Sequence, residues 1–205
     1  MWRVLALSLC LGLVACNESA SVGFRNTDIS GGAFGNALTG FRDHHGHATT
    51  LADFKGKTVI LLFGYTSCPD VCPTVLARLA KVMKTLGPDA DRVQVLIVTV
   101  DPENDTPEKL AAYMTAFNPS FLGVYGDYRA TEAAAKAFKV FYSPAAENAT
   151  AHPAHEHSQA IAPVRIEHSA GSYVFDAHGN IRLYVKDDAP VDAIASDLKW
   201  LLAEQ

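Results

Sequence analysis

The sequence predicts an α/β domain whose partly parallel central sheet is covered by helices on both faces. The sequence has a continuous apolar run at residues 59–63 and a second, mostly apolar run at residues 93–100. Both are too apolar for half-exposed strands and are typical of buried parallel strands. A segment with helical periodicity follows each of them. The chain then closes with a hairpin and a further helix, so a mixed sheet with helices on both faces is expected.

The first central strand leads directly into a helix. Gly56 and Gly64 bound the apolar run 59–63, and helical spacing begins at Pro73. Gly87, followed by Pro88, ends the pattern. The apolar positions on the expected buried face of this helix are Val75, Leu76, Leu79, Val82, Met83 and Leu86.

The segment before this strand predicts an N-terminal β-hairpin. Residues 37–42 and 48–51 are two short segments of mixed apolar and polar residues, and they flank the turn-rich sequence DHHGH at residues 43–47. Upstream, residues 16–34 are rich in Ser, Gly and Asn, which is typical of a flexible tether. The folded domain is expected to cover residues 35–205.

The second half of the chain continues the alternation of strands and helices. Thr106 and Pro107 are a capping residue and a first-turn proline, and they open a helix that runs to about Phe117. The remaining expected elements are a strand at 121–125, an alanine-rich helix at 130–138, a strand at 139–143, a loop at 144–163, hairpin strands at 172–176 and 181–186, and a C-terminal amphipathic helix.

The N-terminal residues predict export. An apolar run at 4–14 follows one basic residue, and it is too short to span a bilayer but fits a secretory signal. The sequence LVAC at 13–16 looks like a bacterial lipobox. We therefore expect a lipoprotein signal peptide at residues 1–15, lipid on Cys16, and a location on the periplasmic side of a bacterial membrane. An ordinary cleavage site or an uncleaved anchor are the alternatives.

Charge and cysteine content narrow the function. The formal net charge is −5, with no basic stripe that would bind nucleic acid. Of the four cysteines, Cys10 would leave with the signal and Cys16 would carry lipid. Cys68 and Cys72 remain in a compartment where disulfides persist, so they must be oxidised, or be kept reduced by a partner or a metal.

The pair Cys68 and Cys72 lies where the central strand passes into the helix. A helix N-terminus favours negative charge, so the pKa of both thiols is expected to be low and both sulfurs reactive. Residues four apart on a helical path could close a disulfide with modest adjustment, or offer two soft ligands to one metal. Two buried structural cysteines are the alternative. A redox pair at this position narrows the fold to the thioredoxin-like class.

Three motifs resemble the Sco/SenC family of copper chaperones for cytochrome c oxidase assembly. They are FGYTSCPDVCPTVL at 63–76, TVDPENDTPEKLAAY at 99–113 and EHSAGSYVFDAHGNI at 167–181. The resemblance covers nearly the whole mature domain. The first motif is the most specific, because thioredoxin-like proteins mostly use Cys-x-x-Cys and this one has Cys-x-x-x-Cys.

The resemblance implies a copper site made of Cys68, Cys72 and His168. Two thiolates select Cu(I), and an added imidazole lets the same site hold Cu(II). The implied role is delivery of copper to the copper A centre of cytochrome c oxidase, with the copper-site subunit of the oxidase as partner. Asp101 and Asp70 are candidates for orienting groups at the site. A turn role for Asp101 and a helix-capping role for Asp70 explain them about as well.

Other functions stay open. The same two sulfurs could reduce the copper-site cysteines of the oxidase, with a periplasmic thiol-disulfide donor as a further partner. A copper or redox sensor would use the same site. Two histidine clusters, His44, His45 and His47 and then His152, His155 and His157, could gather metal loosely, although solvated loops are the simpler interpretation.

Overall fold

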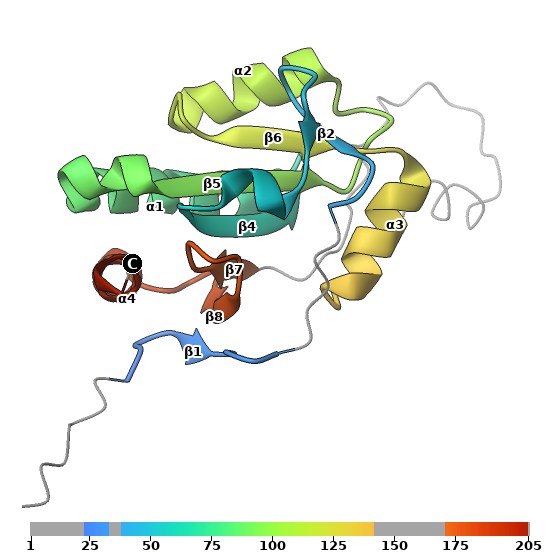
Figure 1. Cartoon of the computed structure of the whole chain (residues 1–205). Coiled ribbons are helices and arrows are strands. Elements are labelled where there is room, and N and C mark those ends of the chain that lie inside the picture. The colour runs from blue at the N-terminus through green and yellow to red at the C-terminus, as the bar shows by residue number, and fades with distance from the viewer. Residues whose placement is uncertain (1–22, 33–37, 142–170, 205) are drawn as a thin grey trace, which may run out of the picture.

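The structure, a computed structural model, describes residues 23–32, 38–141 and 171–204. Its strands form one mixed sheet in the order β1-β8-β7-β4-β5-β6-β2-β3 (Figure 1). The strands are β1 (Thr27–Asp28), β2 (Phe41–Asp43), β3 (Ala48–Thr49), β4 (Thr58–Gly64), β5 (Val93–Thr99), β6 (Leu122–Tyr125), β7 (Gly171–Phe175) and β8 (Ile181–Lys186). The helices are η1 (Leu51–Phe54), α1 (Val71–Leu86), η2 (Gly87–Arg92), α2 (Pro107–Phe117), α3 (Tyr128–Ala137) and α4 (Val191–Ala203).

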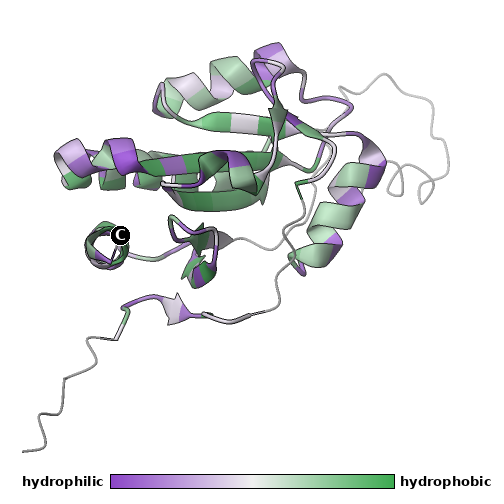
Figure 2. Ribbon diagram, in the orientation of Figure 1, coloured by the Kyte–Doolittle hydropathy of each residue, from purple (hydrophilic) through white to green (hydrophobic). Residues whose placement is uncertain are grey.

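The two apolar runs form the centre of the sheet. β4 pairs in parallel with β5, and β5 in parallel with β6, while β7 pairs antiparallel with the other side of β4. Every residue of β4 and β5 is buried. Figure 2 shows these strands as the most continuously hydrophobic part of the molecule. Burial on both faces explains why neither strand alternates apolar and polar residues.

Helices cover both faces of the sheet, as expected. One core joins the sheet to α1, α2 and α4 through residues such as Leu79, Met114 and Leu198. The other joins it to α3 and the N-terminal hairpin through Phe41 and Phe138. Successive strand residues point alternately into the two cores, because side chains of a strand alternate between faces.

The helix limits follow the predicted signals. Gly87 ends α1 with φ of 61°, a left-handed conformation that glycine adopts without strain. Thr106 caps α2 by accepting a hydrogen bond from the backbone N–H of Lys109 at 3.3 Å, and Pro107 is the first helical residue. α1 begins at Val71, before the expected Pro73. The helix accommodates this proline because backbone N–H groups in the first turn have no hydrogen-bond partner within the helix.

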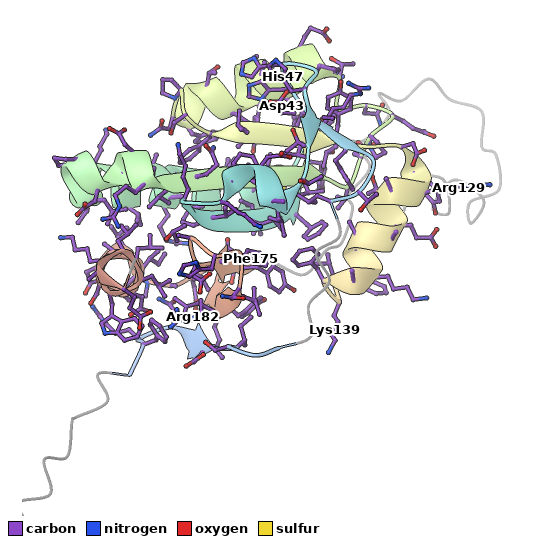
Figure 3. All side chains as sticks on the ribbon, viewed as in Figure 1. Asp43, His47, Arg129, Lys139, Phe175 and Arg182 are labelled. Carbon is purple, nitrogen blue, oxygen red and sulfur yellow. The ribbon has the colours of Figure 1, made fainter. Side chains whose placement is uncertain are left out.

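The strand predicted at residues 139–143 is wrong for the described part, residues 139–141. α3 ends in a Schellman motif, in which the N–H of Val140 donates to the carbonyl of Ala135 at 2.8 Å and that of Lys139 to Lys136 at 3.1 Å. Lys139 takes the left-handed position with φ of 55° at the end of α3, where Figure 3 labels it. Because this position holds a lysine and not the usual glycine, the end of the helix could not be recognised from the sequence.

The tether expected at residues 16–34 is partly folded onto the domain. β1 pairs antiparallel with β8, beside which it lies in Figure 1. The buried carboxylate of Asp197 in α4 accepts hydrogen bonds from the backbone N–H groups of Arg25 at 2.9 Å and Asn26 at 2.8 Å. The domain boundary expected at residue 35 is therefore too late. The predicted signal peptide and Cys16 lie outside the described residues.

No helix within the described ranges is long and apolar enough to cross a membrane.

Candidate thiol and metal site

The two cysteines meet where β4 passes into α1. Cys68 lies in the loop that follows β4, where its backbone N–H donates to the carbonyl of Tyr65 at 3.2 Å. Cys72 lies in the first turn of α1 and is 1% exposed, whereas Cys68 is partly exposed. Both are thiols, and their side chains are hydrogen-bonded to each other. The helix begins only after Cys68, so this contact is made by a loop and not by a continuous helical path.

Gly64 makes room for the buried sulfur. A Cβ atom at this last residue of β4 would lie 2.8 Å from Sγ of Cys72 and 2.9 Å from Cδ1 of Ile97. Carbon atoms in ordinary contact are about 3.5–4.0 Å apart. The glycine therefore lets the sulfur of Cys72 pack directly against the backbone of the central strand.

The expectation that both thiols have a low pKa is wrong for Cys72. Its hydrogen bond with Cys68 raises the pKa of the Cys72 thiol far above the usual range, and burial raises it further. The backbone N–H of Tyr65 opposes this shift, while the negative charge of Asp105 adds to it. Cys72 is thus a protonated thiol at neutral pH, and the partly exposed Cys68 is the sulfur that solvent or a partner reaches first.

A buried carboxylate, Asp105, connects the cysteine loop to the neighbouring strand. It is 1% exposed and accepts hydrogen bonds from the hydroxyl and backbone N–H of Thr66, at 2.5 Å and 3.0 Å, and from the hydroxyl of Thr99 at 2.6 Å. Burial raises the pKa of Asp105 despite these donors. Asp105 thereby fixes the start of the cysteine loop against the end of β5.

Asp105 was not among the site residues expected from the sequence. It lies in the stretch between β5 and α2, where an aspartate near Thr106 and Pro107 is typical of a turn. A signal was present in Thr66 and Thr99, two hydroxyl residues at or just after the ends of adjacent parallel strands. Such a pair indicates a polar partner between the strand ends.

The charges of this site also act on the hydroxyl of Tyr113 in α2. It is buried and has no hydrogen-bond partner among the described residues. Burial raises the pKa of Tyr113, and the charges of Cys72, Cys68 and Asp105 raise it further. A buried hydroxyl without a partner costs about 1–3 kcal/mol, so its presence here needs an explanation.

The structure gives Asp101 a turn role. Its carboxylate oxygens accept hydrogen bonds from Nδ2 of Asn104 at 2.9 and 3.1 Å, and its N–H donates to the hydroxyl of Thr99 at 3.0 Å. Asp70 is exposed at the N-cap position of α1, but its side chain makes no capping hydrogen bond. An orienting role for either carboxylate at a metal stays a prediction.

The third predicted ligand, His168, lies outside the described residues, as do His152, His155 and His157. β7 begins at Gly171, three residues after His168 in the sequence. Ser172 pairs with Leu62, near the end of β4 from which the cysteine loop departs. Within the described ranges there is no group of three or more His, Cys, Asp or Glu side chains that could hold a metal ion.

The hairpin histidines have structural partners. Nδ1 of His44 accepts a hydrogen bond from the backbone N–H of Gly123 at 3.0 Å, and burial lowers the pKa of His44. A neutral imidazole that accepts at Nδ1 carries its proton on Nε2. That Nε2–H faces Nε2 of His45 at 3.1 Å, so it has no lone pair for a metal ion.

Asp43 holds the rest of this turn. Its Oδ1 accepts the backbone N–H groups of His45 and His47, both at 2.9 Å, and its Oδ2 contacts Nδ1 of His47 at 3.2 Å, the pair labelled in Figure 3. This described histidine cluster therefore forms a hydrogen-bonded turn in which His44 is buried, and loose metal binding by the cluster stays a prediction.

Comparison with known proteins gives one consistent result. Residues 40–203 match the family model described as SCO1/SenC. The chain is 34% identical over 163 residues to the human "Protein SCO2 homolog, mitochondrial", covering 78% of this chain and 57% of that protein. It therefore spans less than two thirds of the length of this mitochondrial relative.

Solved structures agree with the sequence comparison. The structure described as Bradyrhizobium japonicum ScoI with copper bound is 30% identical and matches with a TM-score of 0.65, over 78% of this chain and 95% of that one. Apo Sco1 from Thermus thermophilus is 38% identical, with a TM-score of 0.60 over 75% and 84%. The expected thioredoxin-like fold with its mixed sheet is thereby confirmed.

Proposed function

Because this chain belongs to the SCO1/SenC family, we propose that it binds copper through Cys68, Cys72 and His168. Its task is to deliver that copper to the copper A centre during assembly of cytochrome c oxidase. The observation that carries the proposal is the contact between two thiols, one buried and one partly exposed, at the junction of β4 and α1.

The donor set fits copper as cargo. Two convergent sulfurs are the ligands that Cu(I) prefers, and an imidazole nitrogen would also allow the site to hold Cu(II). ScoI of Bradyrhizobium japonicum, at 30% identity, has been solved with copper bound. The partial exposure of Cys68 suits a cargo that must leave by ligand exchange, since an incoming ligand needs access to the bound ion.

His168 is the proposed third ligand. The register between β7 and β4 supports this assignment, because the first residues of β7 lie beside the end of β4. A ligand three residues upstream of Gly171 needs only a short connection to the end of the sheet that carries the cysteines. Replacing it should therefore remove a ligand without disturbing the buried strands.

Elemental analysis and X-ray absorption of the anaerobically purified domain test the proposal. We expect one copper per chain with sulfur and nitrogen ligands in a ratio of two to one. His168→Ala should lose the copper while both thiols remain titratable, and His178→Ala, an exposed histidine in the turn between β7 and β8, should keep it. Full copper retention in His168→Ala would reject the assignment.

Thiol-disulfide reduction is the second candidate, and the unequal exposure of the two cysteines favours it. In this role the Cys68 thiolate attacks a disulfide of the oxidase copper-site subunit, which releases one partner thiol and forms a mixed disulfide. Cys72 then gives up its proton and attacks the sulfur of Cys68. The second partner thiol leaves, and a disulfide between Cys68 and Cys72 remains for a periplasmic donor to reduce.

Trapping the mixed disulfide tests this second role. With a disulfide-containing peptide as substrate, Cys72→Ser should accumulate a mixed disulfide through Cys68, visible by mass spectrometry. Cys68→Ser should accumulate none, because the remaining thiol is buried and protonated. Equal trapping by both variants would contradict the division between an attacking and a resolving cysteine.

The location is a proposal that depends on the N-terminal sequence. We place the mature chain on the periplasmic side of a bacterial membrane, held by lipid on Cys16 after removal of residues 1–15. Labelling with radioactive palmitate should mark the wild type and not Cys16→Ser. A label that persists in Cys16→Ser would exclude this anchor.

A further inference from the structure

The N-terminal segment is fixed to α4 close to where the described residues begin. The buried carboxylate of Asp197 accepts hydrogen bonds from the backbone N–H groups of Arg25 at 2.9 Å and Asn26 at 2.8 Å, and from Nδ2 of Asn26 at 2.8 Å. β1 continues the attachment by pairing with β8. Hydrogen bonds to a buried carboxylate are strong, because the charge would be costly to leave unpaired. This segment therefore has a fixed place beside α4.

An aromatic cluster, made of Phe24, Trp200 and Arg182, lies at this place. The rings of Phe24 and Trp200 meet edge to face with their centroids 4.7 Å apart. The guanidinium carbon of Arg182 lies 5.6 Å from each ring centroid, which is within the range of a cation–π contact. Trp200 is nevertheless 37% exposed, whereas the other large apolar residues of α4 pack in the core. Core packing therefore does not explain this tryptophan.

The charges around the aromatic cluster are paired. Arg182 binds Glu204 at 2.8 Å, and Arg25 binds Asp192 at 2.8 Å. Such a face offers no strong field to a charged ligand. The exposed ring of Trp200 suits a different partner, the boundary between lipid headgroups and water, where one part of the indole is in apolar surroundings and the other part is wet.

The proposed lipid on Cys16 would leave only a short linker before this cluster. Seven residue steps separate Cys16 from Gly23 (23 minus 16). An extended chain covers at most about 3.6 Å per residue, so the linker reaches about 25 Å. A domain of this size has a radius of gyration of about 16 Å and is about 40 Å across. The aromatic cluster therefore cannot lie on the side of the domain far from the lipid.

We propose that the aromatic cluster is the membrane-facing surface of the domain, with Trp200 among the lipid headgroups. This inference rests on the proposed lipid on Cys16. The lipid supplies attachment and the cluster supplies orientation, because a small gain from one tryptophan counts only when a linker already holds the domain nearby. Figure 1 shows α4 and α3 on opposite sides of β7, so α3 would face away from the membrane.

Trp200 is itself the reporter for a fluorescence test. The sequence has two tryptophans, and Trp2 would leave with the predicted signal peptide. The lipidated protein is reconstituted into vesicles of phosphatidylethanolamine and phosphatidylglycerol, with and without bromine on the acyl chains near the headgroups. The matched control moves the tryptophan across the sheet, as Trp200→Phe combined with Tyr128→Trp in α3, where the tyrosine is 49% exposed.

The expected result is a loss of fluorescence at one position only. Bromine quenches an indole that it contacts, so the wild type should lose fluorescence in brominated vesicles. The double variant should keep its fluorescence, because α3 would be held away from the lipid. The measurement on Trp200 uses the unaltered protein, so the absence of any loss there would overturn the inference even if the double variant did not fold.

The outcomes separate this inference from the proposed anchor. Equal loss from both positions, or a larger loss from residue 128, would reject the membrane-facing surface and leave the lipid on Cys16 intact. No loss from Trp200 in protein that floats with the vesicles would do the same. If the wild type did not float with the vesicles, the lipid anchor and this inference would fall together, while the proposed copper binding would be unaffected.

Discussion

The backbone of Gly64 packs against the sulfur of Cys72. A side chain on Gly64 would bring its Cβ to 2.8 Å from Sγ of Cys72. The end of the central strand and the first turn of α1 are thus fitted together around the less accessible of the two thiols. Small changes at this contact should therefore affect the proposed metal site as well as the stability of the domain.

Gly64→Ala should therefore destabilise the domain and disturb the thiol pair. The new methyl group meets the sulfur on one side and Cδ1 of Ile97, at 2.9 Å, on the other. Overpacking of this kind costs about 1–3 kcal/mol. Urea unfolding of the reduced protein measures the loss, and copper content measures the effect on the site.

Gly23→Ala is the matched control, because a Cβ there meets no atom within 4 Å. It should unfold at nearly the same urea concentration as the wild type. If Gly64→Ala also matched the wild type, the close approach at Cys72 would be relieved at no cost, contrary to our expectation.

Copper binding should strengthen as pH rises. The folded site holds the Cys72 proton tightly, because the pKa of this thiol is raised, and a metal ligand must be deprotonated. Each proton released on binding makes the apparent affinity change about tenfold per pH unit below the pKa of its group. Competition with a chelator of known proton affinity measures the apparent copper affinity between pH 6 and 8. Proton release in weak buffer measures the number of protons displaced by each copper ion. A pH-independent affinity would mean that no thiol proton is displaced.

Asp105→Asn should change how stability depends on pH. The pKa of Asp105 is raised above the ordinary value of 3.8, so the folded state holds this proton more tightly than the unfolded state. In the wild type this favours folding at low pH, and the advantage is lost as pH rises through the raised pKa. The asparagine variant cannot lose a proton, so its stability relative to the wild type should increase over the same rise in pH.

Urea unfolding from pH 4 to 7 measures this difference. Asp70→Asn, at an exposed carboxylate, is the control and should track the wild type. If the difference between Asp105→Asn and the wild type stayed constant across this range, the carboxyl would have the same pKa in the folded and unfolded states.

The sequence was sufficient to predict the strands and helices around the site. The apolar runs of β4 and β5, the capping signal at Thr106 and the glycine that ends α1 are local features, and each predicted its element correctly. The end of α3 was not predictable in this way. Its left-handed residue is Lys139, and only the hydrogen bonds of the Schellman motif reveal the turn.

The chemistry of the site was predicted less well than its position. A helix N-terminus correctly indicated where Cys72 lies, but burial and its contact with Cys68 decide its pKa, and neither can be read from spacing. Asp105 accepts hydrogen bonds from Thr66 and Thr99 from a loop far along the chain, and Tyr113 in α2 buries its hydroxyl. Their roles depend on tertiary packing, which a single sequence does not state.

His44 should make the hairpin sensitive to acid without binding metal. Burial and the neighbouring His45 lower the pKa of His44 from 6.5, so the unfolded state takes up a proton more readily than the folded state. Its contribution to stability is complete above pH 6.5 and declines as pH falls toward the lowered value. His44→Asn can keep an acceptor near the N–H of Gly123 but cannot titrate, so its unfolding should depend less on pH between 5 and 7.

His178→Asn, at an exposed histidine in another turn, is the control and should retain the wild-type pH dependence. Copper stoichiometry should be the same in both variants and in the wild type, because Nε2 of His44 carries a proton and donates to His45. A lower stoichiometry in His44→Asn alone would show that the hairpin gives up its hydrogen bond to Gly123 in order to bind metal. The same pH dependence in all three proteins would instead mean that His44 titrates normally when folded.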